Sequence, residues 1–427
     1  MHTIFALATA RGKSGVAILR ISGPSAHEIG VRLAGRLPLA GRTALRRLRG
    51  SDGALLDEAL VLRFDAPRSF TGEDVVELQV HGSIAVIRAV EAAIAQTKMA
   101  RMAEPGEFTR RALLNGHLDL AQVEGLSDLI AAETEAQRKQ AQQLFSGGMR
   151  DFAEICRIEL IRATALIEAT IDFADEEVPV DVSPEVGALI DMVIGRIDAQ
   201  LDGYHTAERV RSGFEVAIIG PPNAGKSTLI NKIAGREIAI TSEIAGTTRD
   251  VLEVRVDLDG LPVTFLDTAG LRDAEDAIEQ IGVARARSRA ADADVRVLLI
   301  DGSQEQADFS PGVSVDLRYM TKSDLTGIGI SALHGDGIDQ LLRDVSALLS
   351  ERVSGMTLAS HERHRQALER AKALLVVAKT VFQRGDDGAE ILALHLRDAV
   401  GALDSLIGRV DVEAVLGEIF AQFCIGK

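Results

Sequence analysis

The sequence has little of what membrane and secreted proteins require. Its two cysteines, Cys156 and Cys424, cannot form a disulfide framework and fit a reducing cytosol. No stretch approaches the roughly 20 consecutive apolar residues of a membrane span. The short apolar run at 4–10 has no basic residue before it and is more typical of a strand than of a signal peptide. We therefore expect a soluble, cytoplasmic protein that does not bind membranes.

Positive charge is also scarce. The chain has 47 lysines and arginines against 63 aspartates and glutamates, which gives a net charge of −16. This balance excludes nonspecific binding of nucleic acid through a global positive field. One stretch departs from it, because residues 32–49 contain six arginines and no acidic residue. Two interpretations of that stretch stay open, a patch that faces RNA and a solvated helix and loop.

A phosphate-binding loop lies near the middle of the chain. Residues 220–227 match the G-x-x-x-x-G-K-[ST] pattern, an apolar run at 215–219 predicts a buried strand before it, and 227–234 predict a helix that ends at Gly235. This order points backbone N–H groups and the positive end of a helix dipole at an anion. Lys226 is predicted to reach the β- and γ-phosphates, and Ser227 to bind Mg²⁺.

Four further motifs follow in the order that a GTPase requires. A strand at 264–267 ends in a D-x-x-G box, with Asp267 expected near Mg²⁺, and the stretch 246–250 before it supplies a second Mg²⁺ ligand, for which we choose Thr248. The T-K-S-D box at 321–324 is expected to select guanine, because a carboxylate can accept hydrogen bonds from the guanine N1–H and N2–H₂, which adenine does not offer. Residues 331–333 complete the guanine pocket. The predicted GTP-binding residues are Asn223, Ala224, Gly225, Lys226, Ser227, Thr228, Ser242, Thr247, Thr248, Asp267, Thr268, Ala269, Gly270, Thr321, Lys322, Asp324, Ser331 and Ala332.

The flanking regions differ in their periodicity. Strands are expected at 16–23, 59–64 and 74–82 and a helix at 84–95, whereas helices dominate from 116 to 210 and again after 350. Helical segments on both sides of a compact α/β domain suggest that this domain is inserted into a helical one.

Three local predictions come from individual residues. Ile155, Ile158, Ile161 and Ala165 recur at helical spacing and are predicted to face the core. Ser183 is predicted as an N-cap, with Pro184 in the first turn of a helix that runs toward residue 211. Arg20 and Glu77 each interrupt an apolar strand, where a charge needs a partner or a ligand. A mutual ion pair and a ligand site both stay open for these two.

Over nearly its whole length the chain resembles the tRNA modification GTPases of the MnmE (TrmE) type. The matching stretches are 15–23, 70–77, 105–112, the GTPase motifs and the terminal sequence F-C-I-G-K at 423–427. The resemblance implies a multidomain α/β and all-α protein. Its domains would be an N-terminal α+β folate-binding-like domain at 1–115, a discontinuous helical domain at 116–211 and 351–427, and an inserted Ras-like P-loop GTPase domain at 212–350.

The resemblance also implies partners and chemistry. Family members form homodimers and join an FAD-containing partner, MnmG, in a heterotetramer. Together they install an aminomethyl-type (carboxymethylaminomethyl) group on carbon 5 of the tRNA wobble uridine, with a reduced folate (5,10-methylene- or 5-formyl-tetrahydrofolate) as the one-carbon donor. Arg20, Glu77 and Lys427 match positions that contact the folate in family members. His117 stands where a lysine is common and gives a weaker, pH-dependent cation.

The chain departs from many GTPases in its catalytic residues. Leu271 follows the D-x-x-G box, where a glutamine often orients the attacking water. The resemblance implies that Glu279 takes this role beside Lys226 and Thr248. It further implies that K⁺ meets the transition-state charge, with Asn223, Ser242, Ile244 and Thr247 as ligands. Thr321 replaces the commoner asparagine of the guanine box and can make fewer hydrogen bonds, so we expect modest nucleotide affinity.

One alternative function stays open, a GTPase switch in ribosome or RNA assembly with a purely structural N-terminal domain. The GTPase motifs do not separate the two hypotheses. The folate positions and the terminal C-x-G-K sequence favour wobble-uridine modification.

Overall fold

The computed structural model describes residues 2–172, 182–221, 223–240, 253–267, 291–303, 314–353, 355–384, 388–409 and 426. The chain forms two compact units, one of residues 1–127 with 404–427 and one of residues 128–403. Among the described helices, none is both long enough and apolar enough to cross a bilayer.

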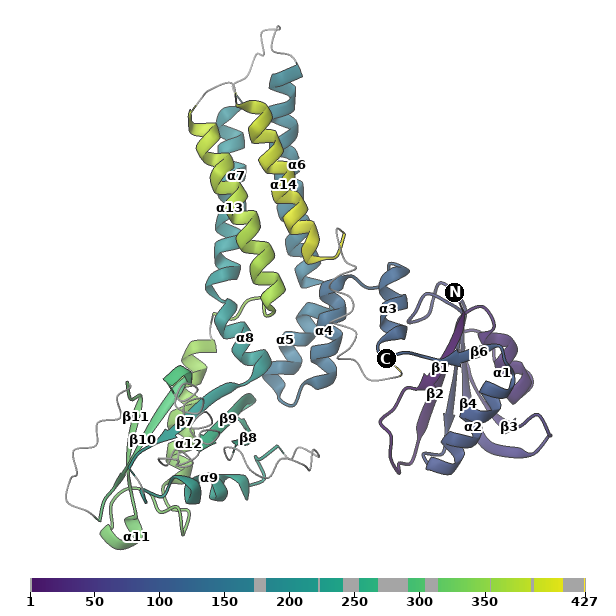
Figure 1. The fold of residues 1–427 in the computed structure, drawn as a ribbon, viewed down its shortest axis with the longest axis horizontal. Helices are drawn as coiled ribbons and strands as arrows, with labels where there is room; N and C mark the ends of the chain where they lie inside the picture. Colours follow the sequence, from purple (N-terminus) through teal and green to yellow (C-terminus); the bar gives the residue numbers. More distant parts are fainter. Residues whose placement is uncertain are drawn as a thin grey trace, which may run out of the picture. The chain divides into compact units, whose positions relative to one another are not determined.

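A six-stranded sheet forms the centre of the first unit (Figure 1), in the order β3-β4-β5-β2-β1-β6. Only the β1–β6 pair is parallel. The predicted strands at 16–23, 59–64 and 74–82 are confirmed as β2, β4 and β5. The strand bounds are β1 Thr3–Leu7, β2 Ala17–Ser22, β3 Thr43–Arg49, β4 Leu55–Phe64, β5 Val75–Val80 and β6 Ala100–Met102.

Helices cover the two faces of this sheet unequally. Helices α1 (Ala26–Ala34) and α2 (Ile84–Gln96) pack on one face, where Ile29 and Val90 join a core with Leu19. The short helix α3 (Glu107–Leu114) places Phe108 against Ile4 on the other face. Helix α4 (Leu120–Ala131) follows.

The first half of the arginine-rich stretch at 32–49 is the end of α1 and a loop, as the helix-and-loop interpretation expected. The second half forms β3, an edge strand of the sheet. Arg46 donates to the Arg36 carbonyl at 2.8 Å, and Arg49 donates to the Gly53 carbonyl at 2.8 Å. Arg32 therefore lies in α1, Arg36 and Arg42 lie in the loop, and Arg46, Arg47 and Arg49 lie along the edge strand β3.

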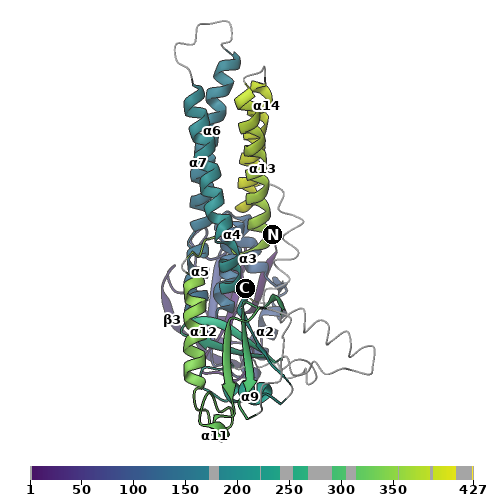
Figure 2. The same cartoon turned by 90° about the vertical axis from the view of Figure 1, so that its left-hand side faces the viewer.

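Four long helices run side by side in the second unit (Figure 2). Helix α7 packs against both α6 and α13, and Arg397 of α14 pairs with Glu168 of α6 at 3.2 Å. The helices that precede and follow the nucleotide-binding sheet in the chain thus pack together. Their bounds, with the two shorter helices between them, are α5 Glu135–Phe145, α6 Gly148–Asp172, α7 Ser183–Asp202, α8 Tyr204–Ser212, α13 Glu362–Arg384 and α14 Ala389–Leu406.

The structure corrects three predictions about these helices. Ile155, Ile158 and Ile161, predicted to face the core, are 45%, 59% and 43% exposed, and Ala165 is also exposed. The opposite face of α6, which includes Cys156 and Leu160, packs against the core instead. Helix α7 begins at Ser183 itself, with Val182 in the N-cap position. It does not run on to residue 211, because Gly203 separates α7 from α8.

A five-stranded sheet carries the predicted nucleotide site. Its order is β11-β10-β7-β9-β8, and all neighbours are parallel except β8 and β9. Helices α9 and α12 pack on one face of it. The bounds are β7 Phe214–Ile219, α9 Lys226–Ala234, β8 Glu253–Leu258, β9 Leu261–Asp267, β10 Val295–Asp301, β11 Leu317–Thr321, α11 Ser323–Thr326 and α12 Ile338–Val353.

Candidate functional site

The predicted phosphate loop joins the end of β7 to the start of α9. Gly220 follows the strand with φ +152°, and a Cβ there would lie 2.4 Å from the Leu299 carbonyl oxygen of β10. Gly225 has φ +90° and no neighbouring atom within 4 Å of an added Cβ, so the space in front of the helix N-terminus is open. Both glycines are therefore required by the backbone, and the loop leaves room for a phosphate where α9 begins.

Lys226 is the charged group of this loop. It is only 6% exposed, and its ammonium group donates to the carbonyls of Gly220 at 2.8 Å and Pro221 at 2.9 Å. Burial lowers the pKa of the ammonium group, while the carboxylate of Asp267 acts in the opposite direction. A buried cation held over a glycine loop is suited to bind the oxygens of a phosphate chain.

The carboxyl ends of the parallel strands bring two aspartates to the same edge of the sheet. Asp267 ends β9, as predicted from the D-x-x-G box, and is 5% exposed. Asp301 ends β10, and its carboxylate lies 2.5 Å from the Lys322 ammonium group. That contact, followed by the Ser303 hydroxyl, lowers the pKa of Asp301 to about 2. Sequence reasoning missed Asp301, although an aspartate at the end of a strand next to β7 could have indicated it.

Thr321 of the guanine box is buried and connects this box to the phosphate loop. Its hydroxyl donates to the Ala224 carbonyl at 2.8 Å and lies 3.2 Å from the Ile300 carbonyl. Next in the box, Lys322 has φ +62°, which turns the chain into α11. The Ser331 hydroxyl donates to the Asp324 carboxylate at 3.0 Å, so the structure brings the two predicted halves of the guanine pocket together.

Part of the predicted site lies outside the described residues. The structure describes Asn223, Ala224, Gly225, Ser227 and Thr228 in or beside the loop, and Ala332 after Ser331. The predicted residues that it does not describe are Ser242, Ile244, Thr247, Thr248, Thr268, Ala269, Gly270, Leu271, Glu279 and Lys427.

Arg20 and Glu77, the two charged residues that interrupt apolar strands, form an ion pair. Arg20 of β2 donates to Glu77 of β5 at 2.8 Å, and their side chains are 20% and 14% exposed. The guanidinium carbon of Arg20 lies 5.2 Å from the ring centre of Phe70 and 5.7 Å from that of Phe108. The ion-pair interpretation is therefore confirmed, and it does not exclude a ligand that contacts the outer edge of the pair.

The turn at residues 70–73, whose Phe70 packs against Arg20, is held in place by Asn115 and His117. Asn115 donates to the Thr71 carbonyl at 2.6 Å, and the ring of His117 lies so close to Gly72 that an added Cβ would be 2.8 Å from its Nε2. Gly426 is buried with φ +105°, and its Cβ would lie 1.9 Å from the carbonyl oxygen of Leu7, at the end of β1. Glycine is therefore required at position 426. Gly426 packs against β1, the strand that pairs with β2.

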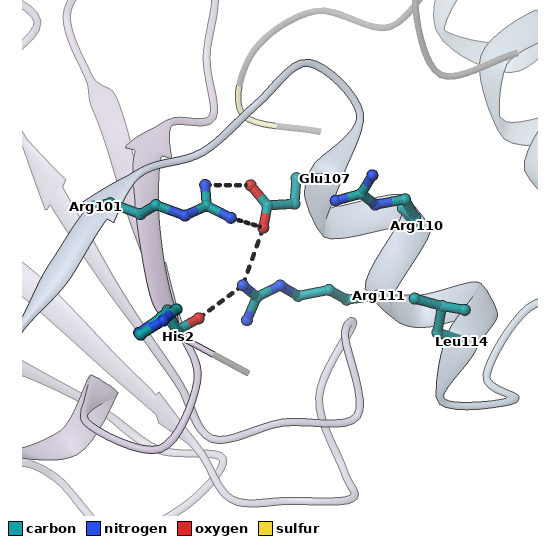
Figure 3. Close-up of a pocket in the computed structure, with 6 residues that line it drawn as sticks. All are labelled: His2, Arg101, Glu107, Arg110, Arg111 and Leu114. Atoms are coloured by element: carbon teal, nitrogen blue, oxygen red, sulfur yellow. Dashed lines mark hydrogen bonds and ion pairs between the residues drawn. The ribbon is translucent and has the colours of Figure 1, made fainter. Parts of the chain in front are cut away.

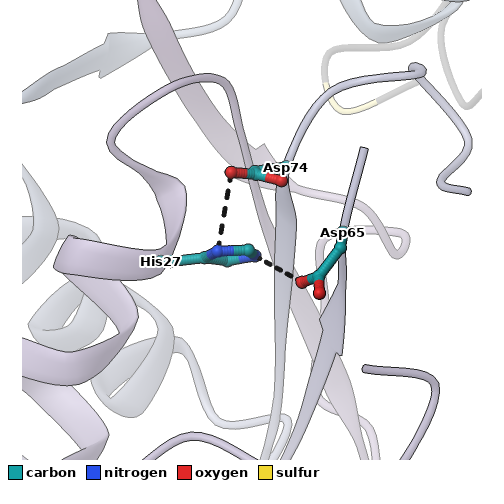
Figure 4. A group of neighbouring side chains, drawn as sticks. All are labelled: His27, Asp65 and Asp74. Carbon is teal, nitrogen blue, oxygen red and sulfur yellow. Dashed lines mark ion pairs between the residues drawn. The ribbon is translucent and has the colours of Figure 1, made fainter. Parts of the chain in front are cut away.

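One further cluster resembles a metal site in composition. His27, Asp65 and Asp74 offer ligand atoms that lie within 4.8 Å of one another (Figure 4). The carboxylates, however, face different ring nitrogens, with Asp65 3.4 Å from Nε2 and Asp74 3.5 Å from Nδ1. An ion binds imidazole through one nitrogen, and Arg63 already donates to Asp65 at 2.7 Å. The cluster is an ion-pair network that connects α1 to β4 and to the loop before β5.

The fold and the site together define a P-loop protein of the GTPase class. The protein-family model of the MnmE helical domain matches residues 120–424. The family model of the "GTP-binding protein TrmE N-terminus" matches residues 3–117. Proteins named tRNA modification GTPase MnmE are 55% identical in Roseobacter denitrificans, 58% in a Jannaschia species and 56% in Dinoroseobacter shibae, and each alignment covers 100% of both chains. The chain belongs to the MnmE family of tRNA modification GTPases.

Proposed function

We propose that this GTPase is activated by K⁺ and acts with an FAD-containing partner, MnmG, on the wobble uridine of tRNA. Buried Lys226, held over the glycine loop by two carbonyl contacts, is the observation that carries the nucleotide-hydrolysing part. Membership of a family of tRNA modification GTPases supports the tRNA substrate. The aminomethyl-type product, the cytoplasmic location and the partner rest on the family resemblance.

Three described residues are proposed to contact the phosphates or the Mg²⁺ ion. Lys226 neutralises charge on the β- and γ-phosphates, and the loop amides before α9 orient them. Ser227, at the start of the same helix, and Asp267, at the end of β9, are proposed to hold Mg²⁺ directly or through its waters. Thr248 and the water-orienting Glu279 complete this proposal from outside the described residues.

Asn223 is the described residue proposed to bind K⁺. It is exposed on the phosphate loop and has φ +65°, a left-handed conformation that asparagine tolerates better than most residues. The side-chain oxygen is the ligand type that a monovalent cation accepts. When bound, K⁺ supplies positive charge beside the phosphates, as an arginine finger does in other GTPases. Ser242, Ile244 and Thr247 are proposed as its other ligands.

The dependence on K⁺ gives the first test. GTP hydrolysis by the wild type is expected to be at least about tenfold faster in KCl than in NaCl at equal ionic strength, since a lost transition-state charge contact costs on the order of 10²–10³ in rate. Asn223→Ala should erase the difference, whereas Asn231→Ala, on the solvent side of α9, should keep it. Equal rates of the wild type in the two salts would refute the cation assignment.

A folate site around the Arg20–Glu77 pair is the second part of the proposal. A folate has a carboxylate tail for cations and a guanine-like edge that donates to a carboxylate, and the pair offers both charges. The partly exposed ring of Phe70 beside Arg20 suits a flat pterin, whereas Phe108 is buried, and His117 lies at the adjoining turn. The packing of Gly426 against β1 supports a role for the residue that follows it, Lys427.

The domain arrangement and the homodimer are proposed on the same basis. Contact between α7 and α13, which flank the nucleotide-binding sheet in the chain, supports its insertion into a helical domain. The proposed boundaries are 1–115, 116–211, 212–350 and 351–427.

A further inference from the structure

A cavity of about 350 Å³ lies in the first unit, and none of the residues that line it is among those proposed for folate (Figure 3). Its lining includes Arg101 from the edge strand β6 and Arg110 and Arg111 from α3. Figure 3 shows the guanidinium groups of Arg101 and Arg111 both joined to Glu107, with Arg110 on the same helix as Arg111. Neither Arg20 nor Glu77 is part of the lining, which is completed by His2 and Leu114.

The inner part of the cavity is fixed by a closed set of ion pairs. Arg111 is 3% exposed and donates to Glu107 at 3.0 Å, to Glu73 at 2.9 Å and to the His2 carbonyl at 2.7 Å. Arg101 forms two parallel hydrogen bonds with Glu107, at 2.7 and 2.8 Å. The Glu107 carboxylate is therefore shared between two guanidinium groups, and the wall that they form is rigid.

The residues that line the cavity carry more positive than negative charge, while Glu73 and Glu104 beside the lining face Arg111 and Arg110. The lining contains three guanidinium groups and one carboxylate, and that carboxylate is fully engaged. Arg110 is 41% exposed, and within the described part of the chain its closest carboxylate contact is Glu104 at 3.5 Å, too long for a good hydrogen bond. Most of its five N–H donors therefore remain available to a ligand in the cavity.

We propose that this cavity binds a backbone phosphate of the RNA substrate, with Arg110 as the contacting residue and Arg101 behind it. The inference rests on the proposed action on tRNA. A planar guanidinium fork matches two phosphate oxygens, and a chain with a net charge of −16 needs such a local site to bind a polyanion. The half-exposed Leu114 offers an apolar wall for the adjoining ribose.

The arginines of β3 are a weaker candidate for the same role. Arg47 lies 3.5 Å from Glu58 across the strand pair, Arg46 and Arg49 donate to carbonyls of their own loops, and none of these three lines the cavity. They lie along an exposed edge strand, whereas the arginines of the cavity converge from β6 and α3.

The test measures tRNA binding to the full-length protein by fluorescence anisotropy at several salt concentrations. Arg110→Ala is expected to weaken binding about fivefold to tenfold at low salt and to reduce the slope of log K against log salt by about one. Arg110→Lys should recover part of the affinity. Arg88→Ala, an exposed arginine of α2, is the matched control and should match the wild type. GTP hydrolysis without RNA should be the same in all four proteins.

Other results would overturn the inference. Unchanged affinity and slope in Arg110→Ala, or an equal loss in Arg88→Ala or Arg47→Ala, would place RNA binding elsewhere. If Arg110→Ala weakens binding of inorganic phosphate or 5-formyltetrahydrofolate while tRNA binding is unchanged, the cavity is a small-anion site. A wild type that does not bind tRNA also overturns it, whereas failure of the proposed function is seen separately in the uridine profile of cellular tRNA.

Discussion

Thr321 shows how a residue that departs from the common guanine box can still support the site. An asparagine there would brace neighbouring loops with an amide. The threonine hydroxyl has one proton, and it donates that proton to the Ala224 carbonyl in the phosphate loop. The sequence predicts that threonine holds the loop with fewer hydrogen bonds than asparagine. In the structure the Thr321 hydroxyl holds the phosphate loop through the Ala224 carbonyl.

Removal of this bond should weaken nucleotide binding. Thr321→Ala leaves the Ala224 carbonyl without its buried partner, which costs about 1–3 kcal/mol. We expect GTP affinity to fall roughly tenfold, with selectivity over ATP preserved because Asp324 is unchanged. Thr321→Ser keeps the hydroxyl and is the control. The measurement is titration of a fluorescent GTP analogue, and a Thr321→Ala variant that binds as tightly as Thr321→Ser would contradict the assigned role.

Glu107 makes the first unit sensitive to acid. Burial alone raises the pKa of this carboxyl group, but hydrogen bonds from Arg101, from the Glu104 backbone and from Arg111 outweigh burial and lower the pKa from 4.5 to about 2. The folded state therefore binds the proton less readily than the unfolded state. The stabilisation is complete above pH 4.5 and is lost as the pH falls towards 2.

Glu107→Gln should reveal this contribution. At pH 7 the variant leaves buried Arg111 with one charge partner fewer, which costs on the order of 3 kcal/mol, or a decrease of very roughly 10 °C in Tm. The Tm difference from wild type should shrink as the pH falls from 5 to 3. Glu104→Gln, whose side chain is 64% exposed, is the control and should be nearly neutral. Thermal unfolding followed by circular dichroism checks this, and a difference that is constant with pH would argue against the ion pairs.

At the scale of elements, the turn between β8 and β9 connects the nucleotide site to the helices. Asp259 and Gly260 both have positive φ, +52° and +86°, which matches the type I′ turn that Asp-Gly favours. The Gly260 carbonyl accepts from the Ala136 amide of α5 at 3.0 Å, and Asp259 accepts from Ser346 of α12 at 2.6 Å. Strand β9 then leads from this turn to Asp267, so one strand spans from α5 to the phosphate site.

A substitution in this turn should lower the thermal stability of the second unit. Gly260→Val places a β-branched residue at positive φ, which costs about 1–2 kcal/mol, and should lower the Tm of the second unit by roughly 2–8 °C. Gly355→Val is the control, because Gly355 has no positive φ and no neighbour within 4 Å. Differential scanning calorimetry gives the Tm, and equal values for the two variants would mean that the turn is not strained by a side chain.

Helix α6 shows why sequence patterns predict elements better than their orientation. Ile155, Ile158 and Ile161 repeat correctly for one helix face, but a second apolar face with Ala153, Cys156, Leu160 and Ala163 exists on the same helix. Periodicity identifies residues that share a face, and it does not decide which of two apolar faces meets the core. In the structure the alanine-containing face is buried, since small side chains let neighbouring helices approach closely.

Long-range pairing limits prediction of the site in the same way. Motifs with fixed local spacing, such as the loop around Lys226, could be read directly from the sequence. The cavity with Arg101, Arg110 and Arg111 could not, because it depends on β6 pairing in parallel with β1. The position of Asp301 at the end of a strand could be read from the sequence, whereas its place beside Thr321 depends on the register of β10 and β11.

At the scale of the whole molecule, the proposed function depends on the chain terminus acting together with the N-terminal sheet. Gly426 packs against Leu7 of β1, and Ala6 of the same strand is in register with Arg20. Lys427, which follows Gly426, lies outside the described residues and is the cation proposed for the folate site. Lys427→Ala is therefore expected to abolish modification while GTP hydrolysis by the purified protein stays within about twofold of wild type, because Lys427 is not among the residues proposed for the phosphate loop.

The measurement is nucleoside mass spectrometry of bulk tRNA from cells that lack the protein and are supplied with one variant. Wild type should restore aminomethyl-type 5-substituted uridines and Lys427→Ala should not, whereas Lys427→Arg should restore part of them, because it keeps the charge. Lys139→Ala, on the exposed face of α5, is the matched control and should restore them fully. If deletion itself leaves the uridine profile unchanged, the protein hydrolyses GTP for another purpose, and a switch in RNA assembly becomes the better hypothesis. If every variant restores the profile, the modification role stands and the terminal lysine is not part of the folate site.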